Sequence, residues 1–168
     1  MPAGATFTQL GTYTLTSNTN AFNFASIPST YTDLWINFKI VPYSAGAAYM
    51  NLQVGSSNTI DSGNNYKNQQ FYLTSSGGNF DFSSATTVEL VGNQFQDKNA
   101  FLGSVRINGY TTSAYKTIMT NMFTSDNTAR NYFSSWVSTN VLNVISLTSS
   151  VSAFGAGSTC SLYGIKAA

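Results

Sequence analysis

Apolar and polar residues alternate strictly over residues 33–41, DLWINFKIV. Leu34, Ile36, Phe38 and Ile40 fall on one side of this pattern. Successive side chains of a β-strand point to opposite faces, so a period of two predicts a strand with one buried face. We therefore expect these four side chains to face a core.

The same period recurs along most of the chain, in short segments separated by Gly, Pro, Asn, Asp and Ser. It predicts about ten strands. The segments with this pattern are 7–15, 20–27, 33–41, 47–54, 68–74, 86–92, 101–110, 115–125, 131–138, 143–149 and 159–166. The inward positions expected besides those of 33–41 are Leu10, Phe22, Phe24, Ala48, Met50, Leu52, Val54, Val105 and Ile107.

The segments between these strands have turn chemistry. We expect a polar loop over 55–65, a hairpin turn over 75–79 that contains Gly77 and Gly78, a connection over 93–100 and a turn over 125–130. No segment combines a 3.6-residue period with a helix cap. The pattern therefore predicts an all-β protein: one domain over residues 1–168, an antiparallel β-sandwich of the jelly-roll type.

Charged residues make up only 8% of the chain, and its net charge is +1. Nucleic-acid binding needs clustered Lys and Arg, so we expect no nucleic-acid partner. Ser, Thr and Asn supply the polarity instead. A surface of hydroxyls and amides lacks the protection that charge gives against self-association, which fits a subunit of an assembly. A neutral β domain of the secreted type is the alternative interpretation.

No run of apolar residues is long enough for a transmembrane helix, and the first residues do not have the pattern of a secretory signal. We therefore expect no membrane partner and synthesis in a cytoplasm.

Residues for catalysis are scarce. The chain has no histidine and one cysteine, Cys160, which alternates with Leu162 and is expected to face inward. Triads that use histidine, imidazole metal sites and structural zinc clusters are thus excluded. No phosphate-binding glycine motif occurs.

Six carboxylates remain, and most of them fall in predicted loops, where Asp is common in turns. Two could in principle serve a glycoside hydrolase, and the loop 58–65 could supply some ligands for calcium. Turn formation is the simpler interpretation, so we expect no enzyme activity, no metal and no cofactor. The carboxylates are Asp33, Asp61, Asp81, Glu89, Asp97 and Asp126.

Aromatic residues make up 14% of the chain. Most Phe side chains are expected in the core, whereas Trp and Tyr among polar neighbours suit protein interfaces and sugar stacking. For Trp35, an interface and packing within the domain are equally good interpretations; for a single Tyr, packing is the more common role. The candidate interface residues are Trp35, Tyr43, Tyr49, Tyr66 and Tyr132.

Two motifs carry a resemblance. The stretch SIPSTYTDL at 26–34 precedes the best strand, and SLYGIK at 161–166 ends the last one. In order and separation they resemble a family of small virion proteins of tailed bacteriophages. The Ile-Pro pair makes a rigid turn, and Gly164 permits a close approach or a bulge. The resemblance implies a trimeric β-sandwich on the exterior of the virion, with assembly in the host bacterial cytoplasm.

This family background suggests a non-enzymatic capsid decoration (cement) protein that stabilises the head lattice, with itself and the major capsid protein as partners. The first strand is expected from residue 7, which leaves no room in this sequence for a fibre-attachment region and favours the head. The alternative is a receptor-binding tail-fibre tip or baseplate component, whose partners are tail or fibre proteins and a bacterial surface glycan. A polysaccharide hydrolase is a third hypothesis.

Overall fold

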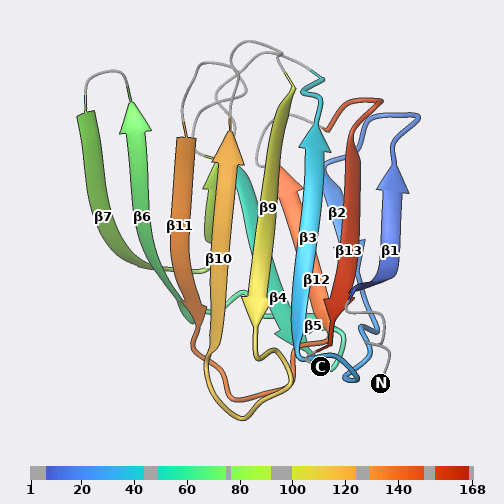
Figure 1. Ribbon diagram of the computed structural model, residues 1–168, viewed down its shortest axis with the longest axis vertical. Coiled ribbons are helices and arrows are strands. Elements are labelled where there is room, and N and C mark those ends of the chain that lie inside the picture. The colour runs from blue at the N-terminus through green and yellow to red at the C-terminus, as the bar shows by residue number, and fades with distance from the viewer. Residues whose placement is uncertain are drawn as a thin grey trace, which may run out of the picture.

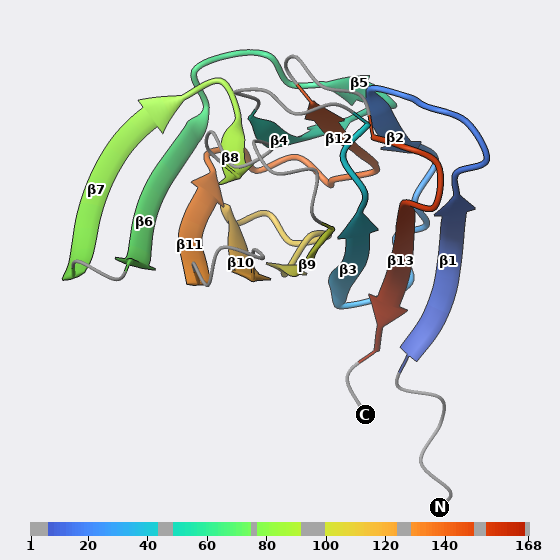
Figure 2. The same cartoon turned by 90° about the horizontal axis from the view of Figure 1, so that it is seen from above.

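The protein is all-β, as the sequence predicts. The computed structural model describes residues 7–43, 49–74, 77–91, 100–123, 129–149 and 154–166. These residues form two antiparallel sheets that pack face to face as a sandwich, with the larger sheet in front in Figure 1 and the two layers seen from above in Figure 2.

The larger sheet has eight strands in the order β1-β13-β3-β9-β10-β11-β6-β7. All its neighbours are antiparallel, and the strands cross Figure 1 from β1 on the right to β7 on the left. Its strands are β1 (Phe7–Thr14), β3 (Asp33–Ile40), β6 (Tyr66–Thr74), β7 (Gly77–Ala85), β9 (Phe101–Asn108), β10 (Lys116–Phe123), β11 (Ala129–Trp136) and β13 (Thr159–Ile165).

The smaller sheet has five strands, in the order β2-β12-β4-β5, with β8 also paired to β4. It lies behind the larger sheet in Figure 1. Its strands are β2 (Ala21–Phe24), β4 (Met50–Ser56), β5 (Thr59–Ile60), β8 (Val88–Val91) and β12 (Val144–Ser149).

The strand pairing is nested. The first strand pairs with the last, β1 with β13, and the pairs β2–β12, β3–β9 and β4–β8 follow inward along the chain. The members of successive pairs alternate between the two sheets. Two hairpins are not members of these pairs: β6–β7, which lies between β4 and β8 in the chain, and β10–β11, which lies between β9 and β12. Both extend the larger sheet on one side. The jelly-roll connectivity stays a prediction, and this nesting is the observation that supports it.

The core lies between the sheets, and the period of two predicted it well. Leu34, Ile36, Phe38 and Ile40 are all buried, while Asn37 and Lys39 on the other side of β3 are exposed. The other inward positions predicted in the described residues are also buried, except Leu10, which is partly buried against the core. Ala48 lies outside the described residues.

The prediction was less accurate for the turns and the number of strands. The described residues hold 13 strands rather than about ten. The strand β7 begins at Gly77, so Gly77, Gly78 and Asn79 pair with β6 instead of forming the predicted turn. The short strand β5 occupies part of the loop expected over 55–65. Residues 92–99 and 124–128, which include most of the connection and turn predicted there, lie outside the described residues.

Candidate functional site

The face of the eight-stranded sheet that points away from the smaller sheet, here called the outer face, carries exposed apolar side chains. Phe123 is 66% exposed, Leu102 58%, and Phe7 and Phe133 47% each. Leu102 pairs with Phe123 across β9 and β10, and Phe133 pairs with Met119 across β10 and β11. Leu102 and Phe123 form one exposed pair, while Phe133 and Phe7 lie further along the same face. Exposed apolar side chains on one face of a sheet provide contact area for a partner.

A polar row runs between these apolar side chains. Asn37 pairs with Ser104, Ser104 with Asn121, and Asn121 with Asn131, so the row crosses β3, β9, β10 and β11. Amide and hydroxyl groups in this arrangement can exchange hydrogen bonds with a partner without the desolvation cost of a full charge. The outer face therefore combines apolar contact area with neutral polar groups.

Trp35 lies on the outer face and is half-buried. Its ring packs against Phe7, with 5.3 Å between the ring centroids. The two rings border a shallow pocket of about 190 Å³. The pocket is lined by Phe7, Trp35, Ser104, Arg106, Asn121 and Ile165. Trp35 thus makes an intradomain contact and also remains partly accessible to a partner.

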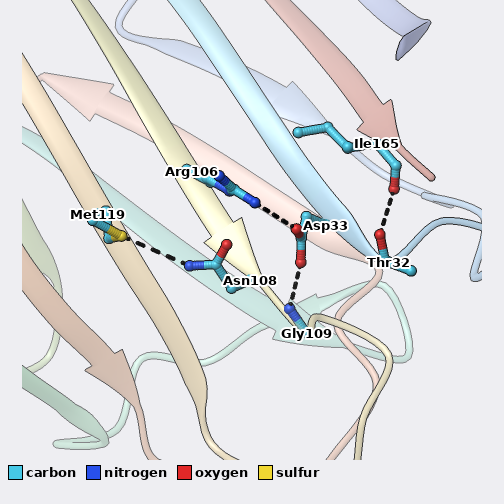
Figure 3. A network of polar contacts seen from close by, with 7 residues as sticks. All are labelled: Thr32, Asp33, Arg106, Asn108, Gly109, Met119 and Ile165. Atoms are coloured by element: carbon cyan, nitrogen blue, oxygen red, sulfur yellow. Dashed lines mark hydrogen bonds and ion pairs between the residues drawn. The ribbon is translucent and has the colours of Figure 1, made fainter. Parts of the chain in front are cut away.

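A network of polar contacts around Asp33 fixes this end of the outer face (Figure 3). One carboxylate oxygen of Asp33 accepts a hydrogen bond from Arg106 at 2.9 Å, and the other accepts one from the backbone N–H of Gly109, also at 2.9 Å. The Asp33 side chain thereby joins the start of β3 to the end of β9. Its carboxylate is occupied by structural contacts.

The two motifs that carry the phage resemblance meet in space. The backbone N–H and the hydroxyl of Thr32 both donate to the carbonyl oxygen of Ile165, at 2.8 and 2.9 Å, and Figure 3 draws the second bond. The ring of Tyr31 lies over Gly164, where a Cβ would be 2.5 Å from its Cγ. This is the close approach expected at Gly164. The contacts give both motifs a structural role.

Two of the five candidate interface residues are not on the surface. Tyr66 is fully buried and Tyr132 is 2% exposed, so the expectation that they form part of a protein interface is corrected. Tyr43 and Tyr49 are exposed, but they flank residues 44–48 beyond the end of β3 and are not on the outer face with Trp35. Of the five, the structure places only Trp35 beside the exposed apolar side chains.

Tyr66 has a structural function instead. Its hydroxyl donates to the carbonyl oxygens of Val54 or Asp61, at 2.9 and 3.0 Å, and accepts from the backbone N–H of Val54 at 3.0 Å. Burial raises the pKa of the phenol well above its usual range. The ring therefore stays neutral and holds β6 of the larger sheet to β4 of the smaller one.

A second site, which the sequence did not reveal, is a small pocket here called the polar groove. Its volume is about 140 Å³. In Figure 2 the hairpin β6–β7 reaches past β8 of the smaller sheet. Residues of this hairpin and of β8 line the groove. It is lined by Asn68, Gln70, Ser83, Ala85, Thr87, Glu89 and Tyr132. Glu89 of β8 is half-buried here.

The side chains with the most reactive groups are buried. The Cys160 thiol is buried, and burial raises its pKa to about 12. Lys116, a buried lysine that the sequence did not single out, donates to the carbonyl oxygens of Thr112, Ala114 and Ser138. Burial lowers the pKa of Lys116.

Asp61, in the loop considered for calcium, is also engaged. One oxygen accepts from Trp136 Nε1 at 2.7 Å and from Asn65 at 2.9 Å, and the other accepts from the Gly63 backbone at 2.8 Å. Within the residues that the structure describes, no three His, Cys, Asp or Glu side chains group as metal ligands would. The same residues contain no helix with the length and apolar composition to cross a bilayer.

No protein-family model and no curated protein matches this sequence.

Proposed function

We propose that this chain is a non-enzymatic structural protein of a tailed-phage virion, a capsid decoration protein that docks on the head through the outer face of its larger sheet. The single observation that carries the proposal is the exposure of four large apolar side chains on this face: Phe7, Leu102, Phe123 and Phe133. Apolar side chains on the surface carry little free-energy penalty in a subunit of a lattice, because neighbouring molecules cover them from water.

The composition of the outer face supports the same role. The polar row of Asn37, Ser104, Asn121 and Asn131 carries no charge, so contacts through it depend weakly on salt. Each contact of this kind is weak by itself, but the symmetry of a capsid repeats it many times. A homotrimer that sits on the major capsid protein is the arrangement we propose.

The nested strand pairing supports a jelly-roll interpretation of the sandwich, with β6–β7 and β10–β11 as inserted hairpins. Jelly rolls serve in viral capsid proteins and in lectins. This fold-level argument agrees with a virion protein and does not by itself separate head from tail.

The test is the number of copies of this chain in a purified virion, measured by quantitative mass spectrometry against the major capsid protein. A decoration protein should be present in hundreds of copies. A few copies to a few dozen would instead indicate a tail-fibre tip or baseplate component, and absence from the particle would overturn the proposal.

A further inference from the structure

We propose that the polar groove is a binding site for one neutral sugar residue of a glycan. The groove is separate from the outer face, so the inference does not depend on how the chain docks on a particle. Its floor comes from three neighbouring strands of the larger sheet: Tyr132 from β11, Asn68 and Gln70 from β6, and Ser83 from β7. Its wall is formed by Thr87, just before β8, and Glu89, in β8.

The first argument is that the inner-facing side chains of β6 and β11 change from aromatic to polar along these strands. Where the smaller sheet covers β6 and β11, their inner positions are Tyr66 and Trp136, which are buried in the core. Further along, the inner positions become Asn68 and Ser134 on neighbouring strands. A surface that served packing alone would carry apolar side chains there, since buried polar groups destabilise a core unless they are paired.

The second argument is incomplete hydrogen bonding at the floor. Asn68 is 8% exposed, and its Nδ2 donates to the carbonyl oxygen of Thr87 at 2.8 Å. Among the described residues that line the groove, Asn68 has a buried Oδ1 with no hydrogen-bond partner. Native structures contain few such groups, and those present call for an explanation. A ligand hydroxyl that reaches Asn68 Oδ1 would supply the missing donor and leave the bond from Nδ2 to Thr87 intact.

The third argument is the match to one chemical class. Amides, hydroxyls and a carboxylate line the groove, and they can both donate to and accept from a ring of sugar hydroxyls. Glu89 is the one charged residue among the seven that line it, which disfavours an anionic ligand. The volume of about 140 Å³ suits a single sugar unit rather than a drug-sized molecule.

The test is a titration of the full chain with four probes, D-glucose, D-galactose, D-mannose and N-acetyl-D-glucosamine, followed by amide chemical shifts. At least one should bind saturably, with a dissociation constant of about a millimolar, and should shift the amides of Asn68, Gln70 and Ser83. The variant Gln70→Ala should bind about tenfold more weakly. Its matched control is Gln69→Ala, because Gln69 is the next residue of β6 and points to the exposed outer face.

Saturable binding that Gln70→Ala weakens and Gln69→Ala leaves unchanged would establish the site. No saturable binding by any of the four sugars would overturn the proposal, and so would binding that Gln70→Ala does not change. If Gln70→Ala fails to fold, the shifts in the unaltered chain decide: shifts confined to other parts of the sandwich would overturn it. The copy number in the virion is unaffected by any of these results, so the two proposals fail independently.

Discussion

The hydroxyl oxygen of Tyr66 on β6 lies 2.9 Å from the carbonyl oxygen of Val54 on β4 and so connects the two sheets of the sandwich. The residue is fully buried, and its hydroxyl bonds the N–H and carbonyl oxygen of Val54 and the carbonyl oxygen of Asp61. Its burial leaves the outer face, rather than the inner tyrosines, as the surface for interaction.

Tyr66→Phe should destabilise the fold by about 1–3 kcal/mol, because it removes the acceptor of the buried Val54 N–H. The free energy of unfolding in urea measures this loss. The control is Tyr43→Phe, at a tyrosine that is 61% exposed, which should change stability by less than about 0.5 kcal/mol. Equal effects of the two substitutions would show that the Tyr66 hydroxyl contributes nothing across the sandwich.

Gly164→Ala should destabilise by about 1–3 kcal/mol, since the new methyl group would overlap the Tyr31 ring. The same substitution in a Tyr31→Ala background should cost much less, because the overlapping ring is gone. A double-mutant cycle on unfolding free energies measures the difference. If Gly164→Ala costs the same in both backgrounds, the contact between the two motifs is not what requires glycine.

Asp61 should make stability depend on pH on the acid side. Partial burial alone would raise its pKa, but hydrogen bonds from Trp136, Asn65 and the Gly63 backbone outweigh burial and lower the pKa below the ordinary 3.8. A carboxylate with a lowered pKa stabilises the fold above 3.8, and this contribution is lost as the pH falls further.

The measurement is the unfolding free energy from pH 7 down to pH 2 for the unaltered chain and for Asp61→Asn, which keeps the shape of the side chain. The variant should be less stable at neutral pH and should show a shallower acid decline. Parallel pH profiles would contradict the assigned role of Asp61.

The two tryptophans make a matched pair. Trp136 is 1% exposed and donates to Asp61, so Trp136→Ala should cost about 3–5 kcal/mol. Trp35 is half-buried on the outer face and packs mainly on Phe7, so Trp35→Ala should cost about 1 kcal/mol and weaken docking on the head more than it weakens folding. A loss of several kcal/mol at Trp35 would place it in the core and remove it from the interface.

The sequence predicted the core of this fold where local pattern decides it. The alternation over Leu34, Ile36 and Phe38 can be recognised without knowing any long-range contact, because the smaller sheet covers that part of β3. The same is true of Gly164, whose motif suggested a close approach before its partner, Tyr31, was known.

The sequence pattern did not predict the features that depend on contacts between distant parts of the chain. Tyr66 and Asn68 alternate with the exposed Lys67 and Gln69, but the inner positions of β6 are themselves partly polar, so hydrophobicity did not show which side is buried. The strand β7 was missed because Gly77 and Gly78 favour turns and become strand only through pairing with β6. The polar groove follows from the unequal widths of the two sheets, which no local pattern encodes.

The claim at the centre of this account is that the outer face docks on the capsid. The direct measurement is cosedimentation of the purified chain with phage heads stripped of it, for the unaltered chain and for the double variant Phe123→Asn/Phe133→Asn. Asn already occupies neighbouring outer positions at Asn121 and Asn131, so the fold should tolerate the change. Tyr115→Asn is the control, since Tyr115 is 60% exposed and lies outside the strands.

We predict that the unaltered chain and the Tyr115→Asn variant bind at hundreds of copies per head. The double variant should bind at least about tenfold more weakly at unchanged unfolding free energy. Equal binding by all three proteins would contradict it.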